Sequence, residues 1–306
     1  MTVPQRHITA GDLTPVTIQT ESTYGTGSGT DILYGDVAEG GNFRFKDTAN
    51  PYINWRYGSR SFDPADYVTQ QKDAAFSASL EVRDDDGWEQ IITHAVGIGG
   101  TTVNDPLLPS RTEEIYVKDG NRWRGRTYTG CKTDKLTISA DAPGGVVKFE
   151  EDVLASKSTS ASINSAKAIW STSPAPAVQW MNGITLAGNE IYPQSFKLTI
   201  ANNLDRVRVP NGSGDAITGS LLEGRRTIEF EADVWMEDLS YIANAINNST
   251  PTSGIVITLG IDYPKRLTLS GVRYMADGTL PSLIQDKQRQ TIRLRASSLV
   301  MTALLA

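Results

Sequence analysis

One pattern of segments occurs twice in this chain, and the repetition limits the folds open to it. Residues 75–97 read AFSASLEVRDDDGWEQIITHAVG, which is an alternating strand, an acidic turn and a short helical stretch. Residues 227–248 read TIEFEADVWMEDLSYIANAINN, with the same elements in the same order. Beyond each helix come a pair of strands and a further alternating strand, at residues 116–139 and 146–156 in the first copy and at 256–278 and 291–300 in the second. Two similar β-rich units favour a structural building block, because a duplicated module doubles the copies of an interface.

The repetition predicts a mainly β protein made of two tandem domains. Alternating apolar and polar residues next to glycine-containing turns indicate strands, so we expect two β-barrel or β-sandwich domains with one short α-helix each. The length of 306 residues suits two domains of ordinary size. We place an N-terminal arm at residues 1–40, the first domain at 41–157, a Ser/Ala/Pro-rich linker at 158–180 and the second domain at 181–306.

Acidic residues stand at or just before each predicted helix, Asp84–Asp86 in the first copy and Glu237–Asp238 in the second. Carboxylates at this place can accept from free backbone N–H groups and favour the positive end of the helix dipole. We therefore interpret both clusters as helix caps. The sequence DDDG lacks the ligand order and the closing glutamate of a calcium loop.

Composition excludes several classes of protein. A net charge of −6 argues against a surface that clamps nucleic acid, because such a surface would be basic. No apolar stretch has the length of a membrane span, and the first residues lack the apolar core of a signal peptide. The single cysteine, Cys131, allows no disulfide within the chain. We expect a soluble globular protein that is made in a cytosol.

The sequence contains no recognisable catalytic or metal-binding pattern. The histidines are His7 and His94, and His94 lies in an apolar helical stretch that predicts a structural role. Cys131 follows a glycine in a strand and is interpreted as a small buried residue. No zinc-ligand spacing or phosphate-binding glycine loop is present. We expect no enzymatic activity, no cofactor and no metal ion.

Two segments combine aromatic and basic residues, at 53–60 and 121–128. Such segments bind single-stranded nucleic acid by stacking, but Trp, Tyr and Arg are also enriched at protein interfaces, and the acidic net charge favours an interface. A carbohydrate-binding β-sandwich, with a sugar platform of Trp55, Tyr57, Trp123 and Tyr128, is a further alternative. The segment 53–60 lies in a long loop at residues 50–73, which has a counterpart at residues 202–226.

The stretch GCKTDKLTISADAPGGVVKFEEDVLAS (residues 130–156) resembles the core of major tail tube proteins of long, non-contractile-tailed phages and archaeal viruses. Residues 270–298 repeat the pattern more loosely. The resemblance implies domains that sit side by side in a ring and join their sheets into a hollow tube for the genome. It also implies that a chain with two such domains forms homotrimeric rings with pseudo-sixfold symmetry. A tail terminator, distal tail or baseplate ring protein of the same fold is the alternative within this class.

The resemblance further implies partners, a location and candidate residues. The partners are other copies of the chain, the tape measure, terminator and distal tail proteins, and viral DNA that passes without specific binding; no membrane is involved. The protein would be assembled in the host cytoplasm and become part of the virion tail. The long loops would contact neighbouring subunits or rings through Trp55, Arg56, Tyr57, Arg60, Phe62, Tyr67, Arg206, Arg208, Leu221 and Leu222. Strand alternation offers Glu150, Asp152, Glu229, Glu231 and Asp233 as lumen-facing residues.

Overall fold

The computed structural model describes residues 15–27, 32–37, 44–53, 67–82, 84, 88–97, 108–119, 122–161, 176–180, 183–210, 216–235, 254–275 and 289–303. We call residues 15–161 the first half and residues 183–303 the second half. The first half contains β1 (Pro15–Thr23), β2 (Thr26–Gly27), β3 (Ile32–Val37), β4 (Arg44–Phe45), β5 (Thr48–Ile53), β6 (Tyr67–Val82), α1 (Gln90–Val96), β7 (Arg111–Asp119), β8 (Arg122–Ala140), β9 (Lys148–Ala155) and β10 (Lys157–Ala161).

The second half contains only strands among its described residues. They are β11 (Ile184–Leu186), β12 (Asn189–Ile191), β13 (Ser195–Ala201), β14 (Asp205–Pro210), β15 (Ala216–Leu222), β16 (Thr227–Trp235), β17 (Ile255–Leu259), β18 (Lys265–Ser270), β19 (Arg273–Tyr274), β20 (Arg289–Ala296) and β21 (Ser298–Ala303). The mainly β prediction is confirmed. The second predicted helix lies outside the described residues.

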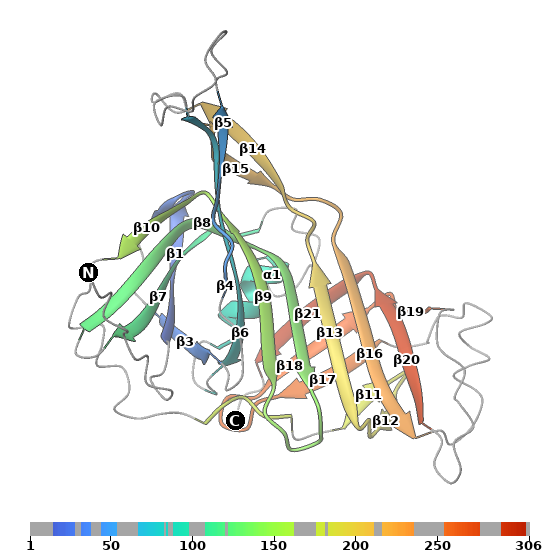
Figure 1. Ribbon diagram of the computed structural model, residues 1–306. Coiled ribbons are helices and arrows are strands. Elements are labelled where there is room, and N and C mark those ends of the chain that lie inside the picture. Colours follow the sequence, from blue (N-terminus) through green and yellow to red (C-terminus); the bar gives the residue numbers. More distant parts are fainter. Residues whose placement is uncertain are drawn as a thin grey trace.

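The strands of the first half close into a barrel. Hydrogen-bonded pairing runs β6–β3–β1–β7–β8–β9 and returns from β9 to β6 (Figure 1). The short helix α1 packs next to β8 and buries Ile91, Ile92 and Ala95. The indole of Trp88, just before the helix, meets the Phe149 ring edge-on, with ring centroids 6.2 Å apart. The interior is therefore apolar where helix and barrel meet.

The second half is a sandwich of two sheets. One sheet contains β13, β16, β20 and β19, and the other has the order β12–β11–β17–β18–β21 (Figure 1). Alternate residues of facing strands are buried, as Ile255, Ile257 and Leu259 of β17 illustrate. The rings of Trp180 and Phe196 meet edge-on, 4.9 Å between centroids. The alternation seen in the sequence thus corresponds to buried and outward faces.

A glycine and a serine mark the same bend in both halves. Gly130 (φ +64°) lies opposite Ser156, and Gly271 (φ +60°) lies opposite Ser297. The amide of Ser156 donates to the Thr129 carbonyl over 2.9 Å, and the amide of Ser297 donates to the Ser270 carbonyl over 3.1 Å. At each bend the chain leaves one set of strand partners for another, from β9 to β10 and from β20 to β21.

Strand registers extend this correspondence. In the first half Phe76 pairs with Val153, three residues before Ser156; in the second half Phe230 pairs with Leu294, three residues before Ser297. Strands β4 and β13 both pair with these phenylalanine-bearing strands. The hairpin β5–β6 corresponds in the same way to the hairpin β14–β15. The two halves share this order and pairing of strands, but among the described strands only the first half is closed, through β3 and β6.

Two segments predicted to lie outside the domains are partly built into the fold. From the predicted arm, β1, β2 and β3 pair within the first half. From the predicted linker, residues 176–180 lie between the halves: the Val178 amide donates to the Val82 carbonyl over 2.8 Å, and the Gly260 amide donates to the Gln179 carbonyl over 2.9 Å. The domain boundaries themselves stay a prediction.

Candidate assembly interface

The two halves are joined by one continuous sheet. Strand β8 pairs with β13 in antiparallel register, from Lys135 opposite Ala201 to Ala140 opposite Phe196. Because β8 also pairs with β9, and β13 with β16, six strands run without a break from one half to the other. Their order is β6–β9–β8–β13–β16–β20. This is the front sheet in Figure 1.

One face of this sheet is buried and the opposite face is polar. The buried face carries apolar side chains from every strand, among them Phe76, Phe149, Ile138, Leu198, Phe230 and Leu294. The register aligns the opposite face in rows across the strands. One row contains Ser79, Glu150, Thr137, Thr199, Glu229 and Arg295. The next contains Glu81, Lys148, Ser139, Lys197, Glu231 and Arg293.

All five candidate lumen residues lie on this polar face, and most are paired there. Asp152 binds Lys46 at 2.6 Å, Glu229 binds Arg295 at 2.5 Å, and Glu231 binds Arg293 at 3.3 Å. Asp233 accepts from Thr291 Oγ1 at 2.6 Å and from Ser195 Oγ at 3.1 Å. Glu150 is exposed. The face carries both signs of charge, so neither sign forms a continuous field.

A second contact between the halves is made by the hairpin β14–β15. It contacts Lys132, Ala155 and Ser156 of the first half. The ammonium of Lys132 binds Glu223 Oε1 at 2.5 Å and the Leu221 carbonyl at 3.3 Å. Ser156 Oγ donates to the Thr218 carbonyl over 2.6 Å. Strand β15 also pairs in parallel with β6, opposite Gln71 and Lys72.

Two arginines of the hairpin complete this contact. Arg206 donates to the carbonyls of Ala74 over 2.8 Å and Ala155 over 3.1 Å. Arg208 binds both carboxylate oxygens of Asp73, at 2.6 and 3.2 Å. Burial lowers the pKa of Arg206, against the opposing effect of Asp73. Bidentate and multiple donation of this kind is characteristic of guanidinium groups at interfaces.

The carboxylate of Glu223 is held in its charged form. Burial acts to raise its pKa, but hydrogen bonds from Lys132 and from backbone amides, including that of Leu108, outweigh this effect and lower the pKa. The ion pair with Lys132 is largely shielded from solvent, with 10% and 15% of the two side chains exposed. The hairpin is thus fixed to the first half by partly buried charges.

The predicted interface residues fall into four groups. Trp55, Arg56, Tyr57, Arg60 and Phe62 lie outside the described residues, and Tyr67 is the first residue of β6. Arg206, Arg208 and Leu221 contact the first half of the same chain. Leu222 stays 56% exposed. Contacts of these residues with a neighbouring subunit remain a prediction.

Asp84 also joins the halves, and its predicted role as a helix cap is wrong. Helix α1 begins at Gln90 after Glu89, and no side chain caps it. The buried carboxylate of Asp84 instead accepts from three successive backbone amides of the second half, those of Ile261, Asp262 and Tyr263, at 2.5, 2.9 and 3.1 Å. The Trp88 indole donates to the Tyr263 carbonyl over 2.9 Å.

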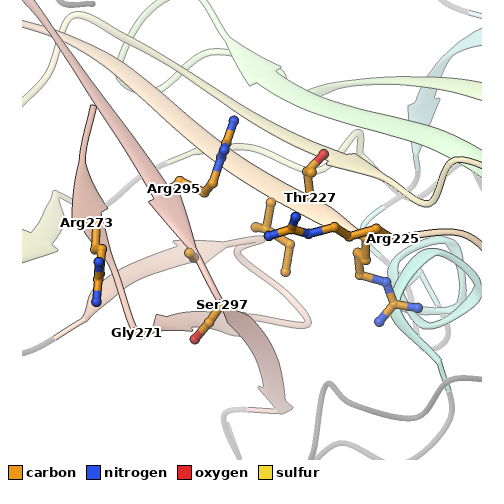
Figure 2. A pocket seen from close by; sticks show the side chains of 9 residues that line it. Arg225, Thr227, Gly271, Arg273, Arg295 and Ser297 are labelled. Carbon is orange, nitrogen blue, oxygen red and sulfur yellow. The ribbon is translucent and has the colours of Figure 1, made fainter. Parts of the chain in front are cut away.

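A cavity of about 560 Å³ lies in the second half at the start of β16 (Figure 2). Its wall is rich in arginine. Arg226 donates to Asn202 Oδ1 over 2.7 Å, and Arg295 binds Glu229. Arg225 and Arg273 have no carboxylate partner in the part of the chain that the structure describes. The lining residues are Arg225, Arg226, Thr227, Ile228, Gly271, Arg273, Arg295, Ala296 and Ser297.

A buried ionic cluster lies inside the first half. Arg111 donates from Nε to Glu113 over 2.5 Å, from Nη1 to Thr133 over 2.8 Å and from Nη2 to Glu151 over 2.9 Å. The side chains of Arg111, Glu113 and Glu151 are all at most 1% exposed. Each group has a charged partner, which offsets the cost of burial.

Neither His94 nor Cys131 is available to a ligand. Both are buried, as expected from the sequence. Burial, with the nearby charge of Arg111, lowers the pKa of His94, and burial raises the pKa of the Cys131 thiol. Tyr128, a member of the possible sugar platform, is also buried and packs on Phe76 with ring centroids 4.9 Å apart.

Among the described residues, no group of three or more His, Cys, Asp or Glu side chains could hold a metal ion. The described part of the chain likewise contains no helix long and apolar enough to cross a membrane.

The sequence interpretation missed Lys132, Ser156, Glu223 and Asp73 as contact residues. One signal for the bend at Ser156 was available: Ser156 follows Gly130 by the same number of positions by which Ser297 follows Gly271. No local signal pointed to the ion pairs, because their partners are far apart in the chain.

Comparison with known proteins agrees with this geometry. The family model for phage tail tube proteins matches residues 11–296. No curated protein matches the chain. Because the match covers most of the sequence, the chain belongs to the phage tail tube protein family. It is a structural component of a viral tail, as the resemblance indicated.

Proposed function

We propose that three copies of this tail tube protein form a ring of six similar modules, and that such rings stack into the tube that conducts the genome. The observation that carries the proposal is the pairing of β8 with β13, which makes one sheet from two modules. A joint that forms once within the chain can form again between chains if the corresponding edges are free.

The corresponding edges are β4 and the segment that begins with β19. Strand β4 corresponds to β13, and β19 corresponds to the part of β8 that follows Gly130. Among the described strands, β4 lies beside β6, and β19 lies beside β20 at the end of the strand order. Strands at the end of a sheet tend to recruit other strands. Pairing of β19 in one chain with β4 in the next would continue the sheet around a ring.

The polar face of the joined sheet suits the wall of a channel for DNA. Its acidic and basic side chains neutralise one another in pairs such as Arg295–Glu229 and Arg293–Glu231. A continuous basic wall would release counterions from DNA and hold it, whereas a mixed wall binds it weakly. We therefore assign Glu150, Asp152, Glu229, Glu231 and Asp233 to the lumen.

Native mass spectrometry and negative-stain electron microscopy of the purified chain test this proposal. We expect trimers and stacked rings that extend into tubes. Rings built from six whole chains would refute the stoichiometry. Single rings that never stack would favour a terminator-like role, since a terminator stops after one ring.

A further inference from the structure

The arginine-lined cavity lies at one end of the polar face of the joined sheet. The strand register places Arg273 of β19 opposite Arg295 of β20, and Arg295 opposite Glu229 of β16. Residues directly opposite each other in an antiparallel pair project from the same face of the sheet, so Arg273 continues this row of polar side chains on the edge strand. Arg225, just before β16, and Thr227, its first residue, line the same cavity (Figure 2). The cavity is thus continuous with the face that we assign to the lumen.

The cavity wall carries more positive charge than the surrounding side chains neutralise. Arg226 is held by two hydrogen bonds, and Arg295 is held by its ion pair with Glu229. Arg225 and Arg273 are exposed, and no described residue offers either side chain a carboxylate. No acidic residue is among the described residues that line the cavity. Two guanidinium groups are therefore free to bind an anion.

The corresponding position of the first half carries a cation that is already neutralised. Gly130 and Gly271 mark corresponding bends, so Lys132 corresponds to Arg273, two residues after each bend. Lys132 forms a largely buried ion pair with Glu223 at 2.5 Å. Arg273 is exposed on the edge strand and has no such partner among the described residues. The surplus of positive charge at this position therefore belongs to the second half alone.

We propose that this cavity is a contact site for the phosphate backbone of the DNA that passes along the tube. Guanidinium groups bind phosphate through parallel N–H donors, and Arg225 and Arg273 can supply such donors without a competing carboxylate. Contacts of this kind read no base sequence, and the net charge of −6 keeps them weak, so that the genome is guided without being held. Because the first half has no counterpart, a ring of three chains would carry three such contacts. The inference rests on the proposed function, which assigns the polar face to the lumen.

Binding of a fluorescein-labelled duplex oligonucleotide of mixed sequence by the dilute full-length chain tests the site, with fluorescence anisotropy as the readout. We expect R225Q/R273Q to lower the affinity about tenfold or more at about 50 mM salt, and to reduce the slope of log affinity against log salt by about one for each phosphate contact removed. The matched control is R266Q/K157Q, which removes the same charge from exposed positions on β18 and β10, outside the cavity. The variant R225K/R273K keeps both charges and should keep the slope, because lysine also binds phosphate as a point charge.

Folding and assembly are measured alongside. Circular dichroism spectra and thermal unfolding should be the same for all variants and the unaltered chain, because Arg225 and Arg273 are exposed and no described residue gives them a carboxylate partner. Rings and tubes are scored separately by electron microscopy. An unaltered chain that binds the duplex through these arginines but forms no rings would refute the proposed function and support the phosphate site.

Three outcomes would overturn the inference. No duplex binding by the unaltered chain, or equal losses in R225Q/R273Q and in R266Q/K157Q, would leave only general electrostatic attraction and remove the site. Saturable binding of inorganic phosphate at these arginines without binding of the duplex would make the cavity a free-anion site. Loss of ring formation in R225Q/R273Q with unchanged duplex affinity would make it a contact between copies of the chain.

Discussion

The two halves of this protein share a topology but stabilise the same core positions by different means. Glu151 lies opposite Ala78 in the first half, and Ile292 lies opposite Ala232 at the corresponding place in the second. In the first half Glu113 pairs with Tyr128, two residues before the bend at Gly130. In the second half Ile255 pairs with Leu269, two residues before the bend at Gly271. The first half thus contains a buried ionic cluster around Arg111 where the second half has isoleucine.

The difference shows that one backbone accommodates either a buried ionic cluster or apolar packing at these positions, provided that every buried charge has a partner. A buried ion pair is often no more stabilising than an apolar replacement, but a broken pair is costly. Apolar packing depends on shape and tolerates small losses. We therefore expect the first half to be more sensitive to single substitutions and to pH than the second.

The largest effect should come from Arg111→Met, which leaves Glu113 and Glu151 buried without their cation. We expect a loss of about 3–5 kcal/mol in the free energy of unfolding, the usual result of breaking a buried pair. Urea denaturation followed by circular dichroism measures it. The triple variant R111M/E113I/E151I copies the apolar solution and should recover most of the stability. A triple variant as unstable as Arg111→Met would mean that the halves are not interchangeable at these positions.

The bends offer a more even comparison. Alanine at Gly130 or Gly271 must adopt a positive φ, which costs about 1–2 kcal/mol for an L-residue, and its Cβ would lie 2.8 Å from Ser156 Cβ or 3.0 Å from Ser297 Cβ. We expect both variants to lose about 2 kcal/mol or more. Hydrogen exchange read separately on β8–β10 and on β18–β21 would measure each loss. If Gly130→Ala loses stability and Gly271→Ala does not, the second bend relaxes around the added Cβ and the first does not.

The third comparison is in pH. The pKa of His94 is lowered in the folded state. When the pH falls below the ordinary histidine pKa of about 6.5, the unfolded chain therefore takes up a proton at His94 that the folded chain does not. The contribution of His94 to the free energy of unfolding is then fully present above about pH 6.5, and it falls by up to about 1.4 kcal/mol per pH unit below that pH. His94→Leu should flatten this slope between pH 6.5 and 5.5. Residues 183–306 contain no histidine, so hydrogen-exchange rates in the second half should not show this pH dependence. An unchanged slope in His94→Leu would assign the proton to another group.

The smallest effect is expected on the polar face. Glu229 and Arg295 occupy the places of Ala75 and Leu154 in the first half. Because both charged side chains are about half exposed, with 43% and 55% of their surface in solvent, E229A/R295L should change the free energy of unfolding by less than about 1 kcal/mol. The difference should shrink further in 1 M salt. A larger, salt-independent loss would identify the pair as structural.

The sequence predicts the repeat well because it depends on local patterns. The alternation around Phe76 and Phe230 and the strands that end near Gly130 and Gly271 follow from period-two sterics and turn chemistry. The joint between β8 and β13 could not be predicted in this way, since nothing in either strand encodes its partner. The same holds for Arg111, whose partners Glu113, Thr133 and Glu151 come from three different strands.

The error at Asp84 has the same origin. A carboxylate shortly before a helix usually caps that helix, and propensity alone predicted this role. Tertiary structure instead directs the carboxylate to amides that lie 177 to 179 residues later in the chain. Local rules select the nearest acceptor for a backbone amide, whereas folding can select a distant one.

The long reach of Asp84 has a consequence for biosynthesis. During translation the first half leaves the ribosome well before residues 261–263 exist, so its buried carboxylate cannot be satisfied until the last strands are made. We expect nascent chains to remain incompletely folded, and unable to join neighbours, until synthesis is almost finished. Stalled chains truncated before residue 255 should therefore stay protease-sensitive around Asp84, and only completed chains would enter a growing tail.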